Sequence, residues 1–215
     1  MSDKPILHGV SPSPFVRKVR VALAEKGIAY HQVPVMPFAA SEEFLAMSPL
    51  RKIPVYQEGD FTLPDSSAIL AYLERVQPKP PLYPADARQF ARALWYEEYA
   101  DTKLVELIGA VFFNRVVAKI IGQAPDEAAI AKGLAGLPAA FDYLERELGD
   151  REVLAGTHFS VADIAVSSML VNLAHAGETV DPNRWPGFAA YIARNHARPS
   201  FKQTIEEEKT QLPAV

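Results

Sequence analysis

Cysteine is absent from this chain of 215 residues. Its absence excludes disulfide bonds, thiolate metal sites, CxxC redox chemistry and a cysteine nucleophile. HxxxH and HExxH spacings, which are typical of helical zinc sites, are also missing. The five histidines stand apart, at His8, His31, His158, His175 and His196. We therefore expect no bound metal.

Long apolar runs and long basic runs are missing too. No stretch approaches the roughly 20 apolar residues of a membrane-spanning helix. A net charge of -4 without clustered Lys and Arg gives no electrostatic footprint for nucleic acid or an anionic membrane. The first ten residues, MSDKPILHGV, are too polar for a signal peptide. These features predict a cytoplasmic protein with neither nucleic-acid nor membrane partners.

The first third of the chain has short apolar runs alternating with helical patterns, which predicts an α/β domain. The Glu58-Gly59-Asp60 stretch is typical of a hairpin turn. The predicted elements are a strand over 5–10, a helix from Pro14 to Lys26, a strand over 28–35, a short helix near 41–48, a hairpin over 53–63 and a helix over 64–76. Their order is βαβ followed by ββα.

Proline is concentrated in QPKPPLYP, residues 77–84, which holds four of the 18 prolines. Because proline continues neither a helix nor a central strand, this segment is predicted to be a linker. Beyond it the apolar spacing is helical almost throughout, at about 86–120, 126–148, 160–177, 186–196 and 200–209. The predicted domains are therefore 1–76, mixed α/β, and 85–215, an all-α helical bundle.

The stretch SPSPFVRKVR places two serines and two prolines before three basic residues. Ser13 followed by Pro14 is typical of an N-cap and the first position of a helix. The cations Arg17, Lys18 and Arg20 are unusual there, because a helix N-terminus is already partly positive. Either these side chains point into solvent, or the helix start binds an anion such as a carboxylate, phosphate or thiolate.

Two other pairs have both a structural and a binding interpretation. Ile53-Pro54 indicates an edge strand, a strand start or a cis bond; a cis bond would leave the Ile53 backbone available to an extended peptide-like ligand. Asp65-Ser66 is typical of a helix start. The same two residues could hold the carboxylate and ammonium of an α-amino acid head group.

The run Ser160-Val161-Ala162-Asp163 is a capping-box variant that opens the apolar segment IAVSSMLVNLA. We expect a structural role for it, the start of a buried helix.

Four features in order resemble the cytosolic glutathione transferase superfamily: SPSPFVRKVRVALAEKGI, RKIPVY, LPDSSAILAYL and GTHFSVADIA. The resemblance extends over essentially the whole chain. It implies an α/β thioredoxin-like N-terminal domain that binds glutathione, an all-α C-terminal domain that supplies most of an apolar electrophile pocket, and a homodimer.

The resemblance also implies roles for individual residues. Pro54 would be the cis-proline, and Ile53 would pair through its backbone with the cysteinyl part of glutathione. Asp65, where the family more often has Glu or Gln, would hold the γ-glutamyl head group. The implied glutathione-binding residues are Phe15, Lys52, Ile53, Pro54, Asp65 and Ser66, with Lys52 near the glycyl carboxylate.

Members of this superfamily activate the glutathione sulfur with Tyr or Ser, or use a Cys. This chain has no Cys and no Tyr near its first strand. The register of VRKVRVAL matches Ser13 to the serine of the serine-type classes, while Ser11 lies two residues too early. In this respect the chain resembles a bacterial-style member of the theta and zeta branches. Ser13 is thus the implied catalytic residue.

Aromatic residues on the first long helix of the second domain are candidates for the electrophile pocket, namely Trp95, Tyr99, Phe112 and Phe113, and chiefly the last two. Aromatic residues at helical spacing more often pack in a core. The implied function is a glutathione transferase that joins the thiol of glutathione, its cosubstrate, to a small apolar electrophile. The alternatives are a glutathione-dependent isomerase and a non-catalytic binding or protein-docking module with the same fold.

Overall fold

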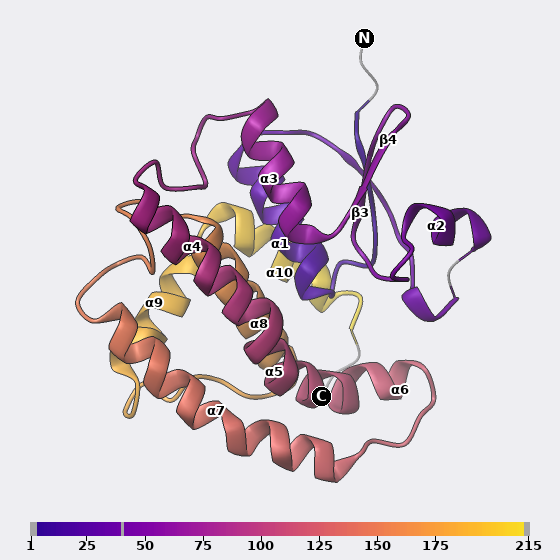
Figure 1. The fold of residues 1–215 in the computed structure, drawn as a ribbon. Coiled ribbons are helices and arrows are strands. Elements are labelled where there is room, and N and C mark those ends of the chain that lie inside the picture. The colour runs from indigo at the N-terminus through magenta and orange to yellow at the C-terminus, as the bar shows by residue number, and fades with distance from the viewer. Residues whose placement is uncertain (1–3, 40, 213–215) are drawn as a thin grey trace. The chain divides into compact units, whose positions relative to one another are not determined.

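The computed structural model describes residues 4–39 and 41–212 (Figure 1). The chain divides into two compact units, Met1–Leu82 and Tyr83–Val215. We call them unit 1 and unit 2, and each has its own buried core.

Unit 1 contains a four-stranded mixed sheet with the order β2-β1-β3-β4. Strand β1 pairs in parallel with β2 and antiparallel with β3, and β3 forms an antiparallel hairpin with β4. The strands are β1 Ile6–His8, β2 His31–Val33, β3 Val55–Glu58 and β4 Phe61–Pro64. The first two are shorter than predicted. Gly9, with φ of 145°, ends β1, and Pro34, which has no amide donor, follows β2.

The helices of unit 1 begin where the sequence supplies caps. The Ser13 and Ser41 hydroxyls accept backbone hydrogen bonds at the starts of α1 and α2, and the Asp65 carboxylate does so at α3. These elements are α1 Pro14–Glu25, η1 Pro37–Ala39, α2 Glu42–Met47 and α3 Ser66–Val76. Helices α1 and α3 pack side by side (Figure 1).

Unit 2 is helical: in residues 83–212 every regular element is a helix. The first long helix contains two π-helical turns, η2 and η3, which the apolar spacing did not predict. The elements are α4 Ala87–Tyr99, η2 Ala100–Leu104, α5 Val105–Phe112, η3 Phe113–Val117, α6 Ala118–Ile120, α7 Glu127–Leu148, α8 Val161–His175, α9 Pro186–His196 and α10 Pro199–Lys209. The βαβ-ββα order of unit 1 and the helical unit 2 confirm the predicted fold class.

Helix α8 is the central element of unit 2, with every residue from Val161 to Leu173 buried. The capping box at its start is present as predicted: the Ser160 backbone N–H and hydroxyl both donate to Asp163 Oδ2, at 2.9 and 3.1 Å. Neither of these residues is exposed. The box therefore begins a helix that is buried from Val161 to Leu173, which is a structural role.

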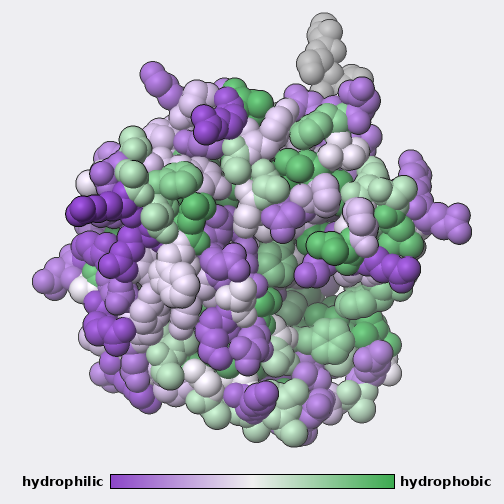
Figure 2. Space-filling view, in the orientation of Figure 1, coloured by the Kyte–Doolittle hydropathy of each residue, from purple (hydrophilic) through white to green (hydrophobic). Residues whose placement is uncertain are grey.

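On the face of the molecule seen in Figure 2, hydrophilic residues alternate with smaller groups of hydrophobic ones. None of the helices in the described ranges is long and apolar enough to cross a membrane.

Candidate functional site in unit 1

Sheet topology brings three of the predicted stretches of unit 1 to one edge. Because β1 and β3 are antiparallel, and β3 and β4 are too, the end of β1, the start of β3 and the end of β4 share that edge. His8 is paired with Val55, and Val55 with Pro64. Ser13 follows β1, Ile53-Pro54 precedes β3 and Asp65-Ser66 follows β4.

Close packing of the backbone holds this edge together. A Cβ at Gly9 would lie 2.5 Å from Val16 Cγ2 on α1 and 3.2 Å from Ile53 Cβ. Only glycine fits between these neighbours, and its φ of 145° is a conformation that other residues rarely adopt. Gly9 therefore lets the start of α1 approach the loop that enters β3.

Ser13 is the N-cap of α1, as the sequence predicts. Its side chain is half-buried, and its Oγ accepts a hydrogen bond of 3.4 Å from the backbone N–H of Val16. A bond of this length is weak. A hydroxyl that accepts one bond still has its own proton to donate, so Ser13 can cap the helix and donate to an anion together.

Ser11 has a different environment. It is 6% exposed, and its Oγ accepts a hydrogen bond of 3.1 Å from Gln32 Nε2. The same amide nitrogen donates to the carbonyl oxygen of Gly9 at 2.9 Å. Ser11 thus fixes the loop after β1 to Gln32 of β2, and of the two serines Ser13 is the more accessible.

The three cations of α1 do not point into solvent, so that interpretation is wrong. Arg17 and Lys18 are fully buried and Arg20 is 4% exposed. Arg17 Nη2 donates to the Pro12 carbonyl at 3.5 Å, and Arg20 Nε donates to the Tyr30 hydroxyl at 2.9 Å. Lys18 Nζ donates to Ser67 Oγ at 2.8 Å. Their aliphatic stems are buried with them, which a periodicity argument does not foresee.

The loop entering β3 presents backbone groups and one cation. The Ile53-Pro54 peptide is cis, as the resemblance implies. Both residues are buried, whereas Lys52 is exposed. The buried Ser48 hydroxyl donates to the Lys52 carbonyl at 2.7 Å and accepts from the Lys52 N–H at 3.1 Å. Ser48, which the sequence analysis missed, thus holds the backbone of Lys52.

The start of α3 combines a carboxylate, a buried hydroxyl and an unusual backbone. Asp65 is exposed and has φ of 79° and ψ of 126°. Its Oδ1 accepts hydrogen bonds of 3.0 Å from the N–H groups of Ser67 and Ala68. Ser66 is 3% exposed. A non-glycine residue held at positive φ is typical of ligand-binding sites, where surrounding contacts offset the backbone strain.

Phe15 and Lys52, the two other residues of the predicted glutathione set, flank this edge. Phe15 is half-buried in the first turn of α1.

Among the described residues no group of three His, Asp or Glu side chains could hold a metal ion. The groups that the predicted residues bring to this edge are hydroxyls, backbone amides and charged side chains.

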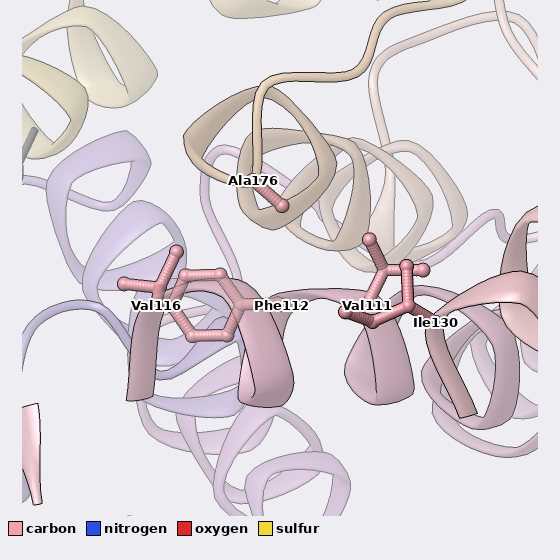
Figure 3. Packing of buried hydrophobic residues seen from close by; sticks show 5 residues of the cluster. All are labelled: Val111, Phe112, Val116, Ile130 and Ala176. Carbon is pink, nitrogen blue, oxygen red and sulfur yellow. The ribbon is translucent and has the colours of Figure 1, made fainter. Parts of the chain in front are cut away.

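In unit 2 the four aromatic candidates have three different environments. Phe112 is 8% exposed and belongs to a core cluster with Val111, Val116, Ile130 and Ala176 (Figure 3). Phe113, one position later, is the first residue of η3 and is partly buried.

Trp95 is exposed at the surface of unit 2, and Tyr99, one helical turn later, is half-buried. Trp95 is 49% exposed, and its Nε1 donates to the Tyr143 hydroxyl at 2.6 Å. The rings of Tyr99 and Tyr143 are 4.9 Å apart. These residues form an aromatic group between α4 and α7, separate from the cluster around Phe112.

Comparison with known proteins gives consistent matches over both units. Residues 7–81 match the family model described as glutathione S-transferase, N-terminal domain, and residues 127–194 match glutathione S-transferase, C-terminal domain. Glutathione S-transferase 3 of Zea mays is 32% identical, over 93% of this chain and 92% of the relative. FtsZ-localized protein A of Caulobacter vibrioides is 27% identical, over 96% and 93%.

Solved structures agree with these matches. A glutathione S-transferase from Rhodospirillum rubrum has a TM-score of 0.86 and 33% identity, over 93% of this chain and 91% of that one. A glutathione S-transferase from Methylobacterium radiotolerans in complex with glutathione sulfonate has a TM-score of 0.78 and 31% identity, over 94% of each chain. Sequence and fold together assign this chain to the glutathione S-transferase family.

Proposed function

We propose that the protein is a serine-type glutathione transferase that joins the thiol of glutathione to a small apolar electrophile. The observation that carries the proposal is the meeting of Ser13, Ile53-Pro54 and Asp65-Ser66 at one edge of the unit 1 sheet. A tripeptide with two carboxylates, an ammonium and a thiol needs hydroxyl, backbone and charged groups within reach of one another.

Each part of glutathione then has a proposed partner. The γ-glutamyl carboxylate binds at the Ser66 end of α3, where helix amides and the partial positive charge favour an anion. The Asp65 carboxylate attracts the neighbouring ammonium. The cysteinyl backbone pairs with Ile53 next to Pro54, as in β-strand addition. Lys52, exposed beside them, attracts the glycyl carboxylate.

Ser13 supplies the catalytic hydrogen bond. An ordinary thiol has a pKa of about 8.5, so only a minor fraction is thiolate at neutral pH. A charge-assisted hydrogen bond worth roughly 1.5–3 kcal/mol would lower that pKa by about one to two. The thiolate sulfur attacks the electrophilic carbon, a C–S bond forms, and the leaving group departs with its bonding electron pair.

For the electrophile we retain Phe112 and Phe113 as proposed pocket residues. Phe113 is the stronger candidate, because the Phe112 ring already packs in the unit 2 core (Figure 3). A substrate that rearranges after thiol addition would make the same site an isomerase.

We also propose a homodimer, since Phe90, Leu94 and Trp95 of α4 are 39–49% exposed and a second copy would cover them.

Replacing Ser13 with Ala tests the proposal. We expect turnover of an activated aryl chloride with glutathione to fall about 10- to 100-fold at pH 6.5, because the thiolate loses its hydrogen bond. The apparent pKa of the rate should rise by a corresponding amount, which a pH–rate profile measures. Ser11→Ala is the matched control and should keep the wild-type profile. An unchanged profile in Ser13→Ala would mean that Ser13 is only a helix cap.

The second candidate is a non-catalytic docking module, supported by the similarity to FtsZ-localized protein A. Both functions fit the fold. Calorimetric titration with glutathione separates them: a docking module needs no glutathione and should give no heat of binding. Binding of glutathione together with thioether formation would exclude this candidate.

A further inference from the structure

We propose that Lys18 is a positioning residue for the γ-glutamyl carboxylate: its buried ammonium lies against the first turn of α3 and strengthens the anion site there. The inference rests on the proposed function and extends it. In the sequence, Lys18 stands out only as a cation near the start of its own helix, α1. In the structure its side chain contacts a different helix, α3.

The geometry is specific to the beginning of α3. Lys18 is fully buried, and its Nζ lies 2.8 Å from Ser67 Oγ. Ser67 follows Ser66 directly, and its backbone N–H donates to Asp65 Oδ1 at 3.0 Å. One residue therefore links the ammonium to both members of the proposed γ-glutamyl clamp. Arg17 and Arg20, the other buried cations of α1, contact Pro12 and Tyr30 in the described structure.

A charge in this position acts on an anion more strongly than an exposed lysine does. Burial lowers the effective dielectric constant and reduces screening by salt. The field of the ammonium adds to the partial positive charge of the α3 N-terminus. Since the hydrogen bond to Ser67 holds the ammonium in place before ligand arrives, little reorganisation is needed when a carboxylate binds.

Lys26, the C-cap residue directly after α1, provides a matched control. Its side chain is also fully buried and also contacts α3, but at the opposite end. Its Nζ lies 2.7 Å from Glu74 Oε2 and 2.7 Å from the carbonyl oxygen of Gln77. Loss of Lys26 should therefore affect stability without weakening an anion site at the start of α3.

The experiment compares two ligands by calorimetric titration: glutathione, and an analogue in which the γ-glutamyl carboxylate is a carboxamide. The measured quantity is the dissociation constant of the carboxamide divided by that of glutathione. Lys18→Met should reduce this ratio about tenfold, because the charge that favours the carboxylate is gone. Lys18→Arg should keep most of the ratio, and Lys26→Met should keep all of it. Thermal unfolding of each variant monitors stability.

The possible results are distinct. A wild-type chain that binds no glutathione overturns the proposed function itself. A wild-type chain that binds glutathione, with an unchanged ratio in Lys18→Met, overturns the role of Lys18 alone, because a merely structural lysine would weaken both ligands equally. Should Lys18→Met not fold, Ser67→Ala replaces it. That variant removes the hydroxyl holding the ammonium and should lower the ratio about threefold, whereas a wild-type ratio would count against the proposal.

Discussion

At the scale of the residue, Arg51 has a backbone conformation that its side chain disfavours. Its φ is 55°, in the left-handed region that costs a non-glycine residue roughly 1–2 kcal/mol. It stands one residue before Lys52, in the loop whose backbone Ser48 holds. The strained residue therefore adjoins the proposed glutathione site, where such backbone is common.

Arg51→Gly should raise the free energy of unfolding by about 0.5–1 kcal/mol. The folded state is stabilised because glycine adopts the left-handed conformation without a steric cost. The greater freedom of glycine in the unfolded chain offsets part of this stabilisation. Urea unfolding measures it. Arg51→Ala is the control: it removes the long side chain but keeps the Cβ, so it should give no gain. Equal gains in both variants would show that the backbone conformation is not the cause.

At the scale of the element, the start of helix α8 depends on one buried carboxylate. Asp163 is fully buried and accepts from the Leu154 N–H at 3.0 Å and the Tyr191 hydroxyl at 2.8 Å, in addition to the two bonds from Ser160. Burial raises the pKa of the Asp163 carboxyl, and these hydrogen bonds act in the opposite direction.

Asp163→Ala should lower the free energy of unfolding by about 3–5 kcal/mol, because several buried donors lose their acceptor together. Ser160→Ala, which removes only the cap hydroxyl, should cost about 1 kcal/mol. Urea unfolding followed by circular dichroism distinguishes the two. Similar losses in both variants would contradict a central role for the carboxylate in holding α8.

At the scale of the whole molecule, tyrosines in both units should make the fold sensitive to alkali. Burial raises the pKa of Tyr56, Tyr96, Tyr99 and Tyr191, and a hydrogen bond to Glu58 raises that of Tyr72. A hydroxyl with a raised pKa in the folded state contributes stability that is present below its unfolded pKa of about 10. That stability is lost as the pH rises through the folded value.

The free energy of unfolding should therefore fall above pH 10. Between pH 7 and 9 tyrosine ionisation should not change the free energy of unfolding, because tyrosine stays protonated in both the folded and the unfolded state. Tyr191 is fully buried, so its share of the slope is about 1.4 kcal/mol per pH unit. Tyr191→Phe should lower stability at pH 7, since the bond to Asp163 is lost, yet reduce the alkaline slope by that amount. Urea midpoints from pH 7 to 11.5 measure both. An alkaline slope identical to wild type would refute the assignment.

The sequence by itself determined the fold class, the helix starts at Ser13, Asp65 and Ser160, and the family resemblance. These features depend on apolar periodicity, caps and turns, which are set by neighbouring residues. The predicted ends of the first two strands were less accurate, because Gly9 and Pro34 interrupt the pairing of strands within otherwise apolar runs.

Only the tertiary structure decided which of the two serines is accessible and where the buried cations point. Lys18 meets Ser67 across 49 positions of the chain, and Ser11 meets Gln32 across 21. A long side chain can follow many directions from one helix position, and the packing of distant elements selects among them. Local pattern could therefore identify Lys18 as unusual, whereas its contact with the start of α3 arises from the packing of α1 against α3.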